Sequence, residues 1–217
     1  MSHPEQLDFV ERIRTISPRH FSGARVLEIG SLDINGTIRS RFSGCDYTGL
    51  DVAEGPGVDV ACQGQDYHAP DASFDTVISC EVMEHNPHWK ATFQNMARLC
   101  KPDGLVVMTC ASWGRREHGT TRSAPDNSPL TVGKGWDYYL NLRAGDFLAA
   151  GLVAPFADWA FFQNWRSYDL YFVGSKAPLD QASRRQLAGL HRHYARESFG
   201  TFKGLKRYLK AHLLVRR

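Results

Sequence analysis

The strongest constraint on the fold is a short apolar run that ends in a glycine turn, V-L-E-I-G-S-L-D-I-N-G at residues 26–36. Such a run predicts a buried strand followed by a loop in which Gly30 lets the backbone approach a ligand closely. The glycines do not match the dinucleotide fingerprint G-x-G-x-x-G, because Leu32 occupies the second glycine position and Gly36 comes late. The turn therefore favours a ligand without phosphate groups.

Short apolar runs recur along the chain and alternate with helical or glycine-rich stretches. This rhythm is typical of an α/β protein with a mostly parallel sheet flanked by helices. Helices are predicted at residues 4–16, at 87–100 with Asn86 as the cap, and at 143–150. A turn at 101–104 should end the second helix. The predicted strands are 25–29, 47–51, 58–61, 74–79 and 105–110, followed by a closing antiparallel hairpin formed by 152–162 and 166–174.

Length and composition favour one main domain with an appendage, since 217 residues with 42% hydrophobic content can build a single core. No apolar run approaches the length of a membrane-spanning helix, and the N-terminus lacks the pattern of a secretory signal. We therefore expect a cytoplasmic protein. The five cysteines are odd in number, widely spaced and without a C-x-x-C pair, which predicts reduced thiols rather than a metal site.

The end of the chain is strongly basic. Residues 179–217 hold ten lysines and arginines but only two acidic residues, although the net charge of the whole chain is +3. We predict a domain at 1–178 and a basic, helical, amphipathic tail at 179–217. We expect an anionic partner for this tail: a membrane reached from the cytoplasm through 198–217, a polyanionic substrate, or nucleic acid. Packing of the tail on the body of the protein or on a second subunit is an equally open alternative. The apolar stripe of the tail is formed by Phe202, Leu205, Leu209 and Leu213.

Four motifs, taken in order, resemble the class I S-adenosylmethionine-dependent methyltransferases. They are E-I-G at 28–30, Y-T-G-L-D at 47–51, S-F-D-T-V-I-S-C-E-V-M-E-H at 73–85 and L-C-K-P-D-G-L-V-V-M-T at 99–109. The resemblance implies a Rossmann-like, seven-stranded sheet whose last strand is antiparallel. It also implies adenosylmethionine as the cofactor, within a subgroup that is similar to small-molecule and sugar methyltransferases.

The resemblance also implies a set of cofactor-binding residues at the strand ends. Asp51 closes the second strand, where a carboxylate can accept hydrogen bonds from both ribose hydroxyls. Asp66 and Tyr67 match the position that borders the adenine, and Cys80 with Glu81 would lie at the sulfonium. The full expected set is Glu28, Gly30, Ser31, Asp51, Val52, Asp66, Tyr67, Cys80 and Glu81.

Methyl transfer needs a base only when the acceptor is a poorly acidic group such as a sugar hydroxyl. His85, after the fourth strand, and His118, in a later loop, are the candidate catalytic bases, and both have structural roles as the alternative. A divalent metal is a third alternative, but no tight ligand spacing supports one, and none is expected. The side chains that offer ligands for it are Glu81, Glu84, His85, His118 and Asp137.

A long polar loop at 111–137 should cover the pocket. It carries several arginines together with Trp113 and Trp136, a mixture that suits sugar faces, anionic groups or nucleobases. We expect O-methylation of a small molecule or of a glycan or lipid-linked sugar, as in polysaccharide biosynthesis. Two alternatives remain open: an RNA or protein methyltransferase, and a catalytically silent partner that binds the cofactor. An oligomer is also open.

Overall fold

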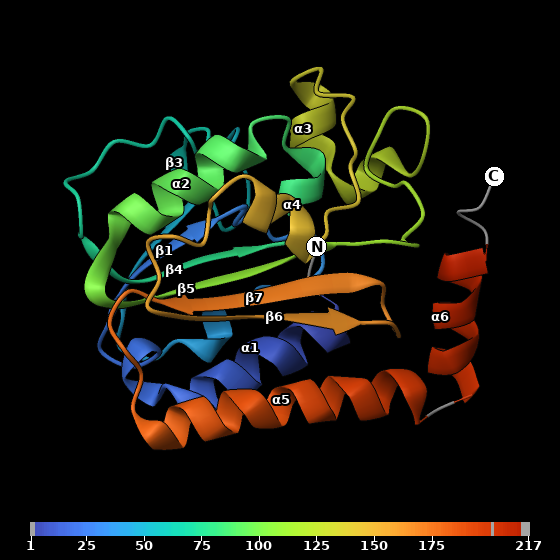
Figure 1. Cartoon of the computed structure of the whole chain (residues 1–217). Coiled ribbons are helices and arrows are strands. Elements are labelled where there is room, and N and C mark those ends of the chain that lie inside the picture. The colour runs from blue at the N-terminus through green and yellow to red at the C-terminus, as the bar shows by residue number, and fades with distance from the viewer. Residues whose placement is uncertain (1–2, 201, 214–217) are drawn as a thin grey trace.

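A seven-stranded sheet forms the centre of the molecule and lies between two layers of helices (Figure 1). The computed structural model describes residues 3–200 and 202–213. The strand order is β3-β2-β1-β4-β5-β7-β6, and every neighbouring pair is parallel except those made by β7, which is antiparallel to β5 and β6. The predicted Rossmann-like fold is confirmed. The strands are β1 Arg25–Ile29, β2 Asp46–Asp51, β3 Val60–Ala61, β4 Phe74–Cys80, β5 Cys100–Ala111, β6 Asp158–Asn164 and β7 Asp169–Ser175.

Successive strand residues feed two separate cores, because side chains alternate between the faces of a sheet. Val26 of β1 belongs to the core that also contains Phe9 and Ile13 of α1, whereas its neighbour Leu27 packs on the other side with Phe93 of α2. Figure 1 shows α1 and α5 below the sheet and α2, α3 and α4 above it. The helices are α1 Pro4–Ile16, α2 Trp89–Leu99, α3 Pro129–Gly133, α4 Ala144–Ala149, α5 Gln181–Phe199 and α6 Phe202–Leu213.

The first half of the predicted tail forms α5, which belongs to the helix layer below the sheet (Figure 1). Helix α5 packs on α1 and β6, and it buries Leu187, Leu190 and Tyr194 in the lower core. The Tyr194 ring lies 5.4 Å from the ring of Tyr171 in β7, an edge-on contact between ring centroids. The domain boundary at residue 178 stays a prediction, and the packing of α5 gives the residues beyond it a structural role in the core.

Helix α6 packs against the end of α5 and against the turn between β6 and β7. Its Tyr208 ring packs edge-on against Trp165 at 5.2 Å and Phe199 at 4.9 Å between centroids. Phe202 is 85% exposed, and Leu209 is also exposed. The predicted stripe therefore includes an outward-facing part, while the side chain of Leu213 and residues 214–217 lie outside the described residues. Within the described part of the chain, no helix has the length and apolarity that crossing a membrane requires.

Several predicted boundaries are wrong. Helix α2 begins at Trp89 rather than at Pro87, because the Asn86 side chain organises the preceding turn: its oxygen accepts the His88 N–H and its nitrogen donates to Thr92 Oγ1, both at 2.8 Å. The predicted turn at 101–104 is absorbed into β5, whose register with β4 shifts at that point.

The third predicted strand and the long loop also differ in detail from the prediction. Strand β3 is shortened to two residues, Val60–Ala61. The loop at 111–137 contains the short helix α3, although its sequence has no helical period. These differences leave the strand order unchanged, so they alter local geometry without moving the edge of the sheet at which the site forms.

Candidate active site

A cavity opens at the carboxyl ends of β1, β2 and β4. The strand order reverses direction between β1 and β4, and open α/β sheets bind ligands at such switch points. Gly30, Asp51 and Glu81 line the sheet side, and residues 127–131 with Trp136 line the opposite side. The space between its walls amounts to about 620 Å³ when the part open to solvent is counted. The loop at 111–137 therefore supplies a wall of the pocket, as predicted.

Gly30 is the turn residue that the sequence singled out, and its geometry admits no side chain. Its φ of +85° lies in the left-handed region, and a Cβ built on it would come within 2.0 Å of Val82 Cγ2. Its N–H donates to the carbonyl of Leu50 at 2.8 Å, which ties the turn to the end of β2. The bare backbone of Gly30 consequently forms part of the cavity surface.

Asp51 closes β2 and holds the same turn through its carboxylate. One oxygen accepts the N–H of Leu32 at 3.1 Å, and the other accepts the N–H of Val52 at 2.7 Å. Burial raises the pKa of Asp51, and these two hydrogen bonds oppose that rise. A carboxylate oxygen has two acceptor sites, so both oxygens retain capacity for a ligand's hydroxyl groups.

Five of the nine predicted cofactor residues line this cavity: Gly30, Asp51, Val52, Cys80 and Glu81. Glu28 is buried away from it, where its carboxylate accepts the Tyr47 hydroxyl at 2.7 Å. Alternation along β1 explains this position, because Ile29 takes the cavity side. Ser31 is also buried, and its side chain packs against Gly49 of β2.

Asp66 and Tyr67, which were expected to border the adenine, do not line the cavity. Asp66 is exposed and accepts the side-chain amide of Gln65 at 3.3 Å. Tyr67 packs on the upper core. The segment instead presents Cys62 and Gly64 to the cavity, because β3 ends at Ala61. The binding roles of Asp66, Tyr67, Glu28 and Ser31 stay predictions that this geometry does not favour.

Glu81 belongs to a buried ionic network that the sequence motifs did not indicate. Its backbone is left-handed, with φ of 57°, and its N–H donates to Thr109 of β5 at 2.9 Å. The His3 ring reaches this position from the start of α1 and lies 3.7 Å from the Glu81 carboxylate and 3.2 Å from that of Asp169. Arg115 contacts Asp169 from the covering loop at 3.1 Å.

The charges of this network balance each other. Burial would lower the pKa of His3, but the neighbouring carboxylates of Asp169 and Glu81 outweigh it and raise that pKa. Burial would raise the pKa of Glu81, but the His3 ring outweighs it and holds that pKa well below its usual range. The arrangement places an ionised carboxylate at the cavity wall, paired with a histidine more than seventy positions away in the sequence.

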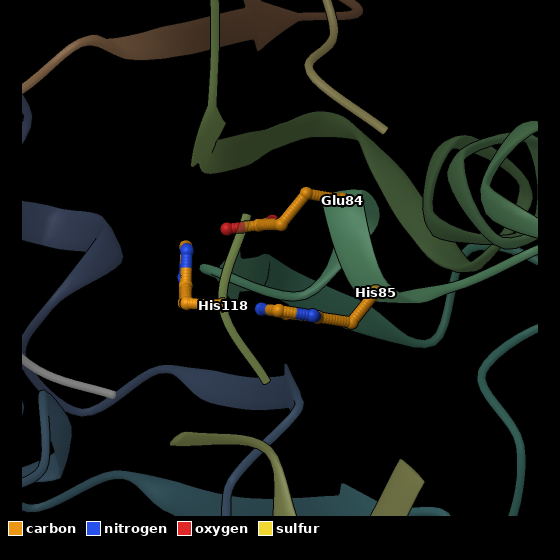
Figure 2. Close-up of side chains that lie close together, drawn as sticks. All are labelled: Glu84, His85 and His118. Carbon is orange, nitrogen blue, oxygen red and sulfur yellow. The ribbon is translucent and has the colours of Figure 1, made fainter. Parts of the chain in front are cut away.

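Glu84, His85 and His118 converge in a second cluster beside the cavity, and Figure 2 shows their polar ends pointing toward one another. The His85 ring is buried, lines the cavity and lies edge-on to His118 at 5.0 Å between centroids. Burial and the adjacent His118 ring lower the pKa of His85 to about 3. Tyr139 packs against both imidazoles, at 5.4 Å and 5.1 Å. Of the side chains considered for a metal, Asp137 does not join them and pairs with Arg122.

Two of the three arginines of the covering loop, together with Arg143 just beyond it, are engaged within the protein. Arg122 forms ion pairs with Glu117, at 2.8 Å, and with Asp137. Arg115 donates to Asp169 and to the carbonyl of Ser167. Arg143 lies over the Trp113 ring, 4.0 Å from its centroid. These contacts explain how a polar loop holds a defined conformation over the cavity, and they reduce its capacity to bind a polyanion.

The sequence missed several groups that complete the site. His3 and Asp169 come from opposite ends of the domain, and nothing in their local pattern indicates that they meet. Asn127 and Ser128 line the cavity from a stretch that looked like an ordinary turn. The groups that the sequence did indicate, such as Gly30, follow buried strands directly, where a glycine indicates a close approach.

Comparison with known proteins agrees with this geometry. A family model described as a methyltransferase domain matches residues 2–141, well over half of the chain. A search of curated proteins finds no match.

Solved structures of methyltransferases share the fold. A Burkholderia thailandensis 1,6-didemethyltoxoflavin-N1-methyltransferase, solved with S-adenosylhomocysteine, is 16% identical with a TM-score of 0.51, and the match covers 82% of this chain and 92% of that one. The CurJ carbon methyltransferase is 15% identical with a TM-score of 0.58, covering 80% and 54%.

A Haemonchus contortus phosphoethanolamine N-methyltransferase 2 is 19% identical with a TM-score of 0.53, covering 96% of this chain. The present chain spans about half the length of that enzyme and of the carbon methyltransferase. The acceptors named for these proteins differ in chemistry, and the similarity to them extends to the fold only. The chain belongs to the methyltransferase-domain family and is a class I S-adenosylmethionine-dependent methyltransferase.

Proposed function

We propose that this enzyme methylates a hydroxyl group of a small polar molecule, with a sugar as the favoured acceptor class. The observation that carries the proposal is the walled cavity, in which a cofactor-type turn faces a polar and aromatic covering loop. A free or lipid-linked sugar of polysaccharide biosynthesis would meet these requirements.

The sheet side of the cavity fits the chemistry of the cofactor. Gly30 offers bare backbone, Asp51 offers a carboxylate suited to a ribose diol, and the ionised Glu81 suits a cationic centre. Val52 and Cys80 would complete this surface. When bound, adenosylmethionine supplies a methyl group that is already activated by its sulfonium. The protein's own task is then to align the acceptor and exclude water.

The covering side of the cavity supports a hydroxyl-rich acceptor. Asn127 and Ser128 bring amide and hydroxyl groups, and Trp136 brings an aromatic surface. Sugars are recognised by this combination, since their hydroxyls hydrogen-bond to such groups while their C–H faces pack on rings.

A macromolecular acceptor receives less support. An RNA would be held by unpaired basic side chains around the cavity, whereas Arg115 and Arg122 are engaged in ion pairs with Asp169, Glu117 and Asp137. The internal pairing favours a small acceptor over RNA or a protein surface.

We also propose that α6 rests on an anionic membrane surface, which would bring the enzyme to a lipid-linked acceptor. Phe202, Leu205 and Leu209 are exposed apolar side chains on α6, within the strongly basic segment 179–217. Apolar insertion combined with attraction to anionic lipids is the usual basis of such binding.

The test combines calorimetry with a methyl-transfer assay. S-adenosylhomocysteine should bind the purified chain, and Asp51→Ala should weaken its affinity about tenfold or more, which corresponds to the loss of a hydrogen-bonding carboxylate. Asp46→Ala is the matched control, because Asp46 is an exposed acid at the other end of the same strand.

Labelled adenosylmethionine is then offered with sugar, lipid-linked sugar, amine and RNA acceptors. Transfer to a hydroxyl of a sugar supports the proposal. Transfer to RNA or to an amine alone would replace it, and cofactor binding without any transfer would favour the silent partner protein.

A further inference from the structure

Three potential metal ligands from two distant segments meet beside the cavity. Glu84 and His85 follow β4, and His118 comes from the covering loop. One ligand atom from each lies within 4.8 Å of the other two. Ligand atoms around a tetrahedral ion with bonds of about 2.0 Å are about 3.3 Å apart, so modest side-chain rotation would close the set around an ion.

Two buried polar atoms of this cluster lack hydrogen-bond partners among the described residues. Glu84 is fully buried; one of its oxygens accepts the Ala111 N–H at 3.1 Å, and the other has no hydrogen-bond partner among the described residues. His85 is buried as well, and its Nδ1 has none either. Buried polar groups are normally paired, so the unpaired Glu84 oxygen and His85 Nδ1 indicate a partner that the described residues do not supply.

His118 is held in the form that a metal ligand needs. Its Nδ1 lies 3.0 Å from the carbonyl of Arg116. A carbonyl can only accept, so Nδ1 carries the proton and Nε2 retains its lone pair. Histidines that bind metals are oriented by this kind of hydrogen bond to a backbone carbonyl.

A second group of three potential ligands provides the contrast. His3, Glu81 and Asp169 also lie close together, but Arg115 and the His3 ring supply positive charge to the two carboxylates. In residues 3–200 and 202–213, no ion pair of this kind reaches Glu84. The Glu84 carboxylate therefore lacks the cationic neighbours that the other group already contains.

We propose that Glu84, His85 and His118 bind a divalent transition-metal ion. Two imidazoles and one carboxylate favour Zn²⁺, Co²⁺ or Mn²⁺ over Mg²⁺ and Ca²⁺, which prefer oxygen ligands. His85 lines the cavity, so a remaining coordination position would face the acceptor side. An ion at this position would hold an acceptor oxygen. That role rests on the proposed function, whereas the existence of the ion site does not depend on it. No metal was expected from the sequence, because the candidate ligands are not closely spaced along the chain. The fold brings Glu84, His85 and His118 together instead.

The experiment uses the full chain, stripped with a chelator and dialysed. Zn²⁺ is titrated by calorimetry, and Co²⁺ is titrated by its visible absorption, which reports ligand geometry. We expect one equivalent of each to bind. His118→Gln and Glu84→Gln should weaken binding by about 100-fold or more, since losing a ligand costs at least as much as losing its supporting hydrogen bond. His68→Gln, at an exposed histidine, is the matched control and should bind as the parent does.

Two results would overturn the metal site. One is the absence of stoichiometric binding of Zn²⁺ and Co²⁺ to a folded chain, as judged by circular dichroism. The other is unchanged binding in His118→Gln, which would place the ion elsewhere. Binding of S-adenosylhomocysteine is measured on the same samples: cofactor binding without metal binding refutes only this inference, and metal binding without methyl transfer refutes only the proposed function.

Discussion

Gly30→Ala tests whether the turn after β1 is shaped by a steric limit. Two costs follow from the structure. A residue with a Cβ in the left-handed region costs about 1–2 kcal/mol, and φ here is +85°. The new Cβ would also meet Val82 Cγ2 at 2.0 Å, and relieving an overpacked contact of this kind costs about 1–3 kcal/mol. We expect a total loss of about 2–5 kcal/mol in the free energy of unfolding.

The two costs can be separated by unfolding the variants in urea and monitoring the unfolding by tryptophan fluorescence. Gly44→Ala is the control for the backbone cost, because Gly44 has φ of +61° and nothing within 4 Å of its would-be Cβ. Val82→Ala in the Gly30→Ala background should recover the steric part, which appears as a coupling energy of about 1–3 kcal/mol in a double-mutant cycle. If Gly30→Ala costs no more than Gly44→Ala and shows no coupling to Val82, the steric argument is refuted.

Three further predictions concern buried charge and the tail. Burial raises the pKa of Glu28 to about 7, although a hydrogen bond from Tyr47 opposes the rise, so the stability that comes from its bound proton is complete below about pH 4.5 and is lost as the pH rises through 7. In urea titrations between pH 4.5 and 8, Glu28→Gln should lose about 3 kcal/mol less of its free energy of unfolding than the parent does. Equal losses in the two proteins would contradict this prediction. Asp169→Asn should cost about 3 kcal/mol in the same assay, because it leaves Arg115 without its buried partner, and a cost near zero would mean that the ion pair contributes nothing. Phe202→Ser should reduce sedimentation with anionic vesicles but not with neutral ones; binding unchanged by this variant or by salt would remove the membrane role of α6.

The fold could be predicted because its signals are local. Buried strands appear as short apolar runs, Gly30 marks a close turn, and the order of strands and helices restricts a parallel sheet to few topologies. Asp51 could be placed for the same reason, since a residue that ends β2 must lie at the edge where β1 and β4 also end. Predicted boundaries were wrong where a side chain formed hydrogen bonds that the local sequence pattern did not indicate, as Asn86 did before α2.

The composition of the site depended on contacts between distant segments. Alternation along β1 turned Glu28 away from the cavity, and the short β3 presented Cys62 in place of Asp66. Sequence alone determined that this chain forms an α/β methyltransferase fold with a glycine turn and an acid at the end of its second strand, because periodicity and turn chemistry act over a few residues. Tertiary structure alone decided that His118 meets Glu84, because such proximity arises only when the covering loop folds back over the sheet.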